Sequence, residues 1–177
     1  MNYYENEKVI SMLDLEYKIF IIEFNKASQL DRSFSKSGLN KSDIIKFRKY
    51  LVKYCLELMD RIDDYSITTK MIRDKIRKLK ELNSNISYGQ AQKVINVCLK
   101  QYLFLTKNIE CISQLDCPLD TITMKGHGIK NNRMINVNEE DYIKYQNIFE
   151  KRYIFRILKD NKYDKERINK FLKNNIS

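Results

Sequence analysis

The hydrophobic residues of this chain recur at intervals of three and four positions, which is the spacing of one face of an α-helix. The pattern predicts helices over residues 5–28, 40–62, 68–82, 87–107 and 138–159, with a last short helix capped by Asp164. Only one Pro and four Gly occur in 177 residues. So few turn residues argue against sandwiches, barrels and doubly wound α/β folds. We therefore expect one all-α domain, residues 1–177, of about six or seven helices.

Each predicted helix has an apolar stripe along one side. In the first helix the stripe is Val9, Leu13, Tyr17, Phe20, Ile21 and Phe24. In the second it is Ile44, Phe47, Leu51, Cys55, Leu58 and Ile62, after a cap at Asn40 or Ser42. In the third it is Ile72, Ile76 and Leu79, and in the short C-terminal helix it is Ile168, Phe171 and Leu172. The strong N-terminal signal at Asn138, which acidic residues follow, starts the helix that we expect to end near Lys159.

The segment after Asn83-Ser84-Asn85 is the most informative part of the chain. Ser87 and Gln90 have the spacing of a capping box, so a helix should begin at Ser87. Its buried stripe is predicted to be Ala91, Ile95, Cys98, Tyr102 and Leu105, widened by Val94, Val97 and Leu99. Such a wide apolar surface predicts a helix at the centre of the core. Further along, we expect Pro118 in the first turn of a short helix and residues 125–137 in an exposed loop.

The charge is strongly positive, with 33 Lys and Arg against 23 Asp and Glu, a net charge of +10. In the third helix Lys70, Arg73, Arg77 and Lys80 are spaced to form one row, and the C-terminal helices over residues 138–177 are also basic towards their end. One interpretation is a row that faces DNA phosphates. The other is an ordinary solvated helix face.

Several kinds of site find no support in the sequence. The four cysteines are scattered and the one histidine is His127, so no pair has the spacing of a zinc site. No Gly-rich phosphate loop, G-x-S-x-G or H-E-x-x-H motif is present. Without a transmembrane span, a secretory signal or paired cysteines, we expect a cytoplasmic protein with reduced thiols and no cofactor.

The remaining candidate for chemistry is a lysine with a carboxylate. Lys93 lies in the second turn of the helix that starts at Ser87, where the helix dipole and partial burial both disfavour a positive charge. The backbone amides of residues Tyr88, Gly89, Gln90 and Ala91 would point out of the same helix end and could bind a phosphate. Asp120 follows, directed by Pro118.

These residues resemble a known family. Gly89-Gln-Ala-Gln-Lys93-Val-Ile-Asn followed by Pro118-Leu-Asp120-Thr-Ile is similar to the core of the helix-hairpin-helix DNA glycosylases, in particular the 8-oxoguanine DNA glycosylase branch and its minimal bacterial relatives. The likeness covers residues 86–122. It implies an all-α fold, a hairpin that grips the phosphate of duplex DNA, Lys93 as nucleophile and Asp120 as its assisting carboxylate. The pattern departs from the family in having a single glycine in the hairpin and a longer interval between lysine and aspartate.

The sequence leaves simpler interpretations open. Lys93 is also compatible with a lysine at the rim of the core, and Asp120 with a helix N-cap. Tyr102, Tyr142, Tyr145 and Tyr153 fit packing better than base stacking. A non-enzymatic nucleic-acid-binding module, or a phage or mobile-element protein that binds a host protein, would have the same composition. The glycosylase hypothesis requires Lys93 and Asp120 to face one cleft.

Overall fold

The computed structural model describes residues 3–29, 38–126, 128–129, 133–153 and 155–157, and within the first helix the side chains of residues 11–25. These residues form six α-helices and two short 3-10 helices, with no strand among them. The α-helices are α1 (Tyr3–Gln29), α3 (Lys41–Asp63), α4 (Thr69–Lys80), α5 (Tyr88–Thr106), α6 (Thr121–Lys125) and α7 (Glu139–Arg152). The 3-10 helices are η1 (Ile109–Gln114) and η2 (Met134–Asn136). The prediction of an all-α fold is confirmed.

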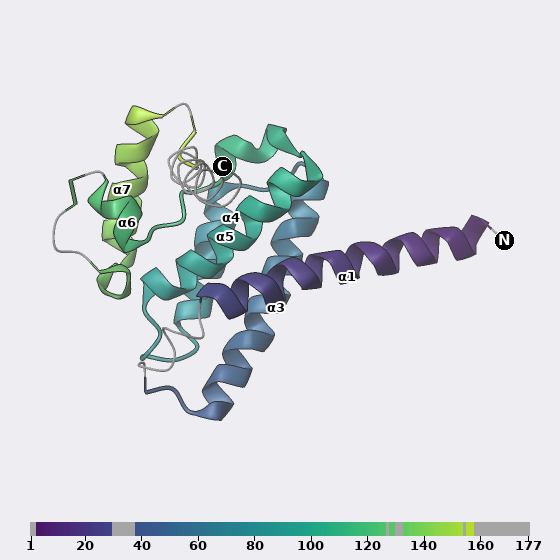
Figure 1. The fold of residues 1–177 in the computed structure, drawn as a ribbon, viewed down its shortest axis with the longest axis horizontal. Coiled ribbons are helices and arrows are strands. Elements are labelled where there is room, and N and C mark those ends of the chain that lie inside the picture. Colours follow the sequence, from purple (N-terminus) through teal and green to yellow (C-terminus); the bar gives the residue numbers. More distant parts are fainter. Residues whose placement is uncertain (1–2, 30–37, 127, 130–132, 154, 158–177) are drawn as a thin grey trace, which may run out of the picture.

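Helix α5 lies at the centre of this arrangement, as its wide apolar surface predicted. Helices α1, α3 and α4 pack against it, together with η1 and η2 (Figure 1). The N-terminal half of α1 extends away from the other helices (Figure 1). Within the described part of the chain, no helix is both long enough and apolar enough to cross a membrane.

The predicted helix starts are set by side-chain caps. Asn40 caps α3 and Ser87 caps α5, each in a complete capping box with the third residue of its helix. Asn138 caps α7 by accepting the amide of Asp141, and three acidic residues occupy the first turn. These bonds satisfy amides that a helix leaves without intrahelical partners, which is why the sequence located the starts well.

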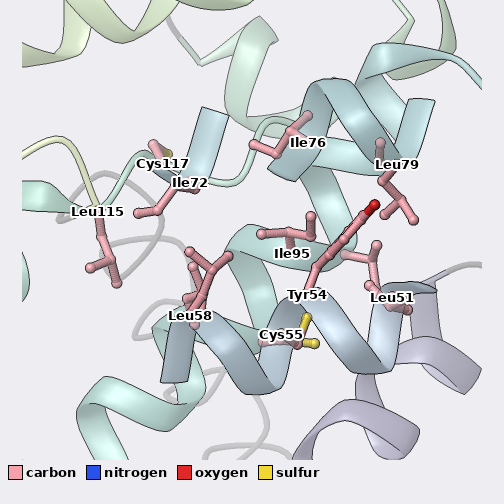
Figure 2. Packing of buried hydrophobic residues seen from close by; sticks show 14 of the residues in the cluster. Leu51, Tyr54, Cys55, Leu58, Ile72, Ile76, Leu79, Ile95, Leu115 and Cys117 are labelled. Atoms are coloured by element: carbon pink, nitrogen blue, oxygen red, sulfur yellow. The ribbon is translucent and has the colours of Figure 1, made fainter. Parts of the chain in front are cut away.

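The core is built from the predicted stripes of the middle helices. Figure 2 shows Leu51, Cys55 and Leu58 of α3 facing Ile72, Ile76 and Leu79 of α4, with Ile95 of α5 between them. In the predicted α3 and α5 stripes, Ile44 is half-buried and Leu105 is 57% exposed. Leu105 lies in the last turn of α5, beyond the reach of the helices that cover the earlier turns.

Three boundaries differ from the prediction. Pro118 lies in a segment without regular secondary structure, whose ends Leu115 and Asp120 are extended, and the short helix α6 begins only after Asp120, which is its N-cap. Helix α7 ends at Arg152 instead of near Lys159, because Tyr153 takes an extended conformation. The expected loop over residues 125–137 contains η2, and Val137 at its end is buried. His127 and the helix expected from Asp164 lie outside the described residues.

The apolar stripe predicted for α1 does not face the core. Of its members, Ile21 is buried, whereas Leu13, Tyr17, Phe20 and Phe24 are exposed and the side chain of Val9 is not described. The face that packs on the other helices consists of Lys18, Ile21, Ile22 and Asn25. Lys18 contacts Asp14, Asp60 and Asp63, and Asn25 donates to Gln101. The helix is therefore attached partly by polar contacts, which an apolar stripe cannot indicate.

Candidate functional site

Lys93 and Asp120 are in direct contact. The Nζ atom of Lys93 donates to Oδ2 of Asp120 at 3.0 Å. Lys93 projects from the second turn of α5, and Asp120 ends the segment that contains Pro118. The side chain of Lys93 is 10% exposed and that of Asp120 is 27% exposed. The pair therefore lies just below the surface, with the carboxylate on the more accessible side.

Asp120 uses its two oxygens for different purposes. Oδ1 accepts the amide of Thr123 at 2.7 Å and caps α6, while Oδ2 binds Lys93. Burial by itself raises the pKa of Asp120, but the charge of Lys93 and the hydrogen bonds from Thr123 outweigh it and bring the pKa below its usual value. Asp120 is therefore a carboxylate at neutral pH. Two of the interpretations left open by the sequence, a helix cap and a partner of Lys93, both describe this residue.

The segment before Asp120 is held by two buried glutamines. Gln92 of α5 donates to the carbonyl of Leu119 at 2.7 Å and accepts the amide of Leu119 at 3.1 Å. Gln146 of α7 does the same for Cys117, at 2.8 and 2.9 Å. A buried backbone without a neighbouring strand or helical turn needs such partners for its polar groups. The two side chains thus fix the backbone on both sides of Pro118 and set the direction of Asp120.

A buried polar network continues from Gln92 towards α4. Asn96 donates to Gln92 and to the hydroxyl of Tyr142, and that hydroxyl donates to Asp116. Asp116 is fully buried, and it also binds Arg73 and Arg156, each at 2.8 Å. Because burial of a carboxylate is costly unless it is paired and hydrogen-bonded, the two arginines are what allow Asp116 to lie there. Burial, and after it the nearby charge of Asp116, raises the pKa of Tyr142.

At the N-terminus of α5, three of the four amides expected to bind a phosphate have partners within the protein. Tyr88, Gly89, Gln90 and Ala91 are all buried. The amide of Gly89 donates to the carbonyl of Val137, that of Gln90 to the Ser87 side chain and that of Ala91 to the carbonyl of Ser87. A Cβ atom on Gly89 would lie 1.7 Å from the carbonyl oxygen of Met134. The glycine is therefore needed because η2 packs against this turn, and the same packing occupies the place where a phosphate was expected.

The predicted basic row on α4 separates into two kinds of residue. Arg73 is turned inward to Asp116, and Arg77 is bound to Glu139 of α7 and to Asp74. Lys70 is exposed and Lys80 is half-buried. Arg73 is therefore the member of the row that turns inward, whereas Arg77 stays exposed while it ties α4 to α7, and Lys70 faces solvent.

The described residues contain no group of three or more His, Cys, Asp and Glu side chains that could hold a metal ion. All four cysteines are buried and form no disulfide.

Two surface hollows lie away from Lys93. One, of about 450 Å³, is lined by residues of α3 and α4 including Glu57, Arg61 and Lys75, and the other, of about 400 Å³, lies on α7.

Sequence reasoning did not single out Gln92, Gln146 and Asp116. A signal was present for the glutamines, since each occupies a position on the buried side of its helix, next to apolar neighbours. No local pattern reports that a segment elsewhere in the chain will need their amide groups.

No known family model, curated protein or solved structure matches this chain. The likeness of residues 86–122 to the DNA glycosylases stays a prediction from the sequence.

Proposed function

We propose that this chain binds DNA and that Lys93 and Asp120 are the reactive pair of a lysine-dependent DNA glycosylase or abasic-site lyase. The observation that carries the proposal is the 3.0 Å contact between an amine on α5 and a carboxylate that lies 27 residues further along the chain. Pairing of a nucleophile with a group that can take its proton is the arrangement that covalent catalysis by lysine requires. The packing of α4 against α5, joined by residues 81–87, is consistent with a helical hairpin at this place.

In the proposed reaction, a damaged or unusual nucleotide is rotated out of the duplex and approaches from the side of Asp120. Asp120 first takes a proton from Nζ of Lys93, which leaves a free amine. The amine attacks C1′ of the sugar while the bond from C1′ to the base breaks, the base leaves with the bonding electrons, and the proton on Asp120 passes to the base. The sugar ring then opens to a Schiff base with Lys93, elimination of the 3′ phosphate cleaves the strand, and water releases the lysine.

The contacts around the pair suit these roles. Asp120 is ionised at neutral pH and is held by Thr123 and, through the backbone, by Gln92. It is also the more exposed member, so a substrate meets it first. Attack requires Oδ2 to release Nζ, a movement that the short helix α6 allows more readily than the long helix α5 does.

Borohydride trapping on oligonucleotides with an abasic site or a damaged base tests this proposal. A lysine that forms a Schiff base becomes covalently attached to the DNA. The Lys93→Met variant keeps the aliphatic stem and should lose the adduct entirely. Lys100→Met is the matched control, because Lys100 is on the same helix and is buried to the same extent, 9% exposed against 8%. Asp120→Asn should lower the trapping rate roughly a hundredfold. Failure to trap on any substrate, or trapping that survives in Lys93→Met, refutes the reaction.

A non-enzymatic DNA-binding module is the second candidate, and a specific observation favours it. Lys93 is 8% exposed and already has a partner, as a structural lysine would. DNA binding without chemistry would then depend on exposed lysines such as Lys70 and Lys78 of α4. Affinity should fall steeply with salt, and each of the variants Lys70→Ala and Lys78→Ala should reduce the salt dependence by about one phosphate contact. If neither duplex nor single-stranded DNA binds at low salt, both candidates fail and a protein partner remains.

A further inference from the structure

The exposed side of α1 has features of a helix that pairs with another helix. Leu13 is 59% exposed, Phe20 65% and Phe24 56%, and Tyr17 between them is 38% exposed. The rings of Phe20 and Phe24 already stack on each other, with their centroids 6.3 Å apart. Contiguous apolar surface of this kind on a soluble protein marks an interaction site more often than single exposed residues do.

The spacing of these residues identifies the kind of partner. Leu13, Tyr17, Phe20 and Phe24 follow one another at intervals of four, three and four residues. The sequence continues the same repeat to Tyr3, Asn6 and Ile10 on one side and to Ala27 on the other. Apolar residues that alternate at three and four over more than three heptads are typical of a two-stranded coiled coil, and one polar residue in the seam is common there. We define residues 3, 6, 10, 13, 17, 20, 24 and 27 as the α1 seam.

A partner helix can contact the seam without displacing the rest of the protein. At about 100° per residue, the seam lies roughly 130° around the helix from the buried face that contains Lys18, Ile21, Ile22 and Asn25. The N-terminal half of α1 also projects beyond the other helices (Figure 1). An unsupported helix of about 12–15 residues is marginal in water, so this half gains most from a second helix along its side.

We propose that α1 forms a parallel coiled coil with α1 of a second copy of this chain. The helix has 27 residues and is about 40 Å long. The four exposed seam residues offer on the order of 400 Å² per copy, and a stable dimer needs about 800 Å². The backbone of α1 is helical from Tyr3, so the positions 3, 6 and 10 of the repeat follow Leu13 along the same side of the helix and lengthen the seam.

The charges beside the seam favour one direction for the pair of copies. Among the described side chains of α1, the exposed charges are Asp14, Glu16 and Glu23, all acidic. In an antiparallel pair Glu16 would face Glu16 of the partner subunit, and like charges would repel. In a parallel pair Glu16 falls beside the partner's Ile21 and Glu23 beside the partner's Ser28, so no like charges meet. An acid-flanked seam that tolerates its own copy in one direction fits a parallel dimer.

Sedimentation velocity of the full chain over a range of concentrations tests the assembly. The wild type should approach twice the chain's 21.3 kDa as concentration rises. The double variant Phe20→Glu/Phe24→Glu changes two exposed seam residues, so it should fold normally and weaken dimerisation at least a hundredfold. Met12→Glu is the matched control, since Met12 is 55% exposed on the same helix but lies off the seam. A wild type that is monomeric up to about 100 μM, or a dimer that the double variant keeps, overturns the proposal.

Engineered cysteines test the direction. The four native cysteines are all buried, so one new thiol can be followed against them. In a parallel pair, Leu13→Cys places two thiols opposite each other, and mild oxidation should link the copies. Leu15→Cys, which is 46% exposed off the seam, should not link them. If both variants are linked equally, or if neither is linked although the protein is a dimer, the parallel pairing is contradicted. If the protein stays a monomer and its seam binds only a basic amphipathic peptide, the seam belongs to an interface with another protein.

Discussion

Along α5, Gln92, Lys93 and Asn96 are buried, whereas along α1 the apolar residues Leu13, Phe20 and Phe24 are exposed. On α5 every polar group just named has a specific partner in another segment or in the helix itself. On α1 the described apolar side chains of the seam are left facing solvent. Polarity alone therefore does not determine burial in this chain.

The difference is a consequence of what surrounds each helix. The segment over residues 116–120 lies against α5 without regular secondary structure and has backbone groups that need partners. Gln92 meets that need, so burial of its amide is stabilising. No described segment crosses the outer face of α1, and its apolar surface stays available for another molecule. The variants that follow alter one helix or the other and compare the effects.

The largest effect is expected from Gly89→Ala. Alanine normally stabilises a helix by about 1 kcal/mol relative to glycine. Here the added Cβ would lie 1.7 Å from the backbone oxygen of Met134, so η2 must move and the bond from Gly89 to Val137 is lost. We expect the free energy of unfolding to fall by on the order of 4 kcal/mol, as measured in urea. Gly128→Ala, which meets no atom within 4 Å but has a positive φ, should lower it by about 1 kcal/mol. If the two alanine variants lower the free energy of unfolding equally, close packing of η2 against α5 is not the reason for a glycine at position 89.

Asp116→Asn should have the second largest effect. The substitution keeps the shape but removes the charge that Arg73 and Arg156 share, so Arg73 loses its carboxylate partner and the buried Arg156 keeps only the exposed Glu150. We expect the free energy of unfolding to fall by about 3 kcal/mol.

The matched control for Asp116 is Glu150→Gln. Glu150 also binds Arg156, at 2.9 Å, but its side chain is 61% exposed. Its replacement should change the free energy of unfolding by less than about 1 kcal/mol. A small effect of both variants would show that the buried network contributes little to the stability of the α5 region.

The parts of this structure that depend on local pattern were predictable from the sequence. The caps at Asn40, Ser87 and Asn138 located three helix starts, and the stripes of α3 and α4 identified core residues. The contact between Lys93 and Asp120 was suggested by the resemblance to the glycosylases, and the structure brings the two residues together.

The remainder depends on contacts between distant segments. The phosphate site expected at Gly89 is covered by residues around Met134, and no property of residues 87–91 indicates that. Arg73 looks like a member of a solvent-facing row until Asp116 is placed beside it, and Arg77 stays exposed but is paired with Glu139 of another helix. The predicted stripe of α1 correctly describes one face of the helix. Periodicity does not indicate whether that face packs against the same chain or against another molecule.

Two adjacent residues of α1 provide the third prediction. Ile21 is 2% exposed and Phe20 is 65% exposed. Ile21→Ala should lower the free energy of unfolding by about 2–3 kcal/mol through loss of buried contacts. Phe20→Ala, a larger truncation, should change it by no more than about 0.5 kcal/mol when the protein is dilute enough to be monomeric. Thermal or urea unfolding at two concentrations measures both, and a large loss for Phe20→Ala in the monomer would mean that the seam packs within one chain.

Apart from the control variants, the smallest effect is expected from Asp120→Asn, and its dependence on pH separates charge from helix capping. Asparagine can still cap α6 through its side-chain oxygen, so the substitution mainly removes the charge opposite Lys93. At neutral pH the variant should be less stable than the wild type by about 1 kcal/mol.

Because the pKa of Asp120 in the folded protein lies below its usual value, the carboxylate stabilises the protein fully only above about pH 4, the range of the unfolded chain. Its contribution is lost as the pH falls through the lower pKa of the folded state. Parallel urea titrations of wild type and Asp120→Asn should therefore converge below about pH 4, since the other carboxyl groups titrate in both proteins. If the difference in the free energy of unfolding between the two proteins stays the same at the lowest pH, the effect comes from lost capping. Asp120 would then stabilise α6 as its N-cap, and its charge interaction with Lys93 of α5 would not contribute.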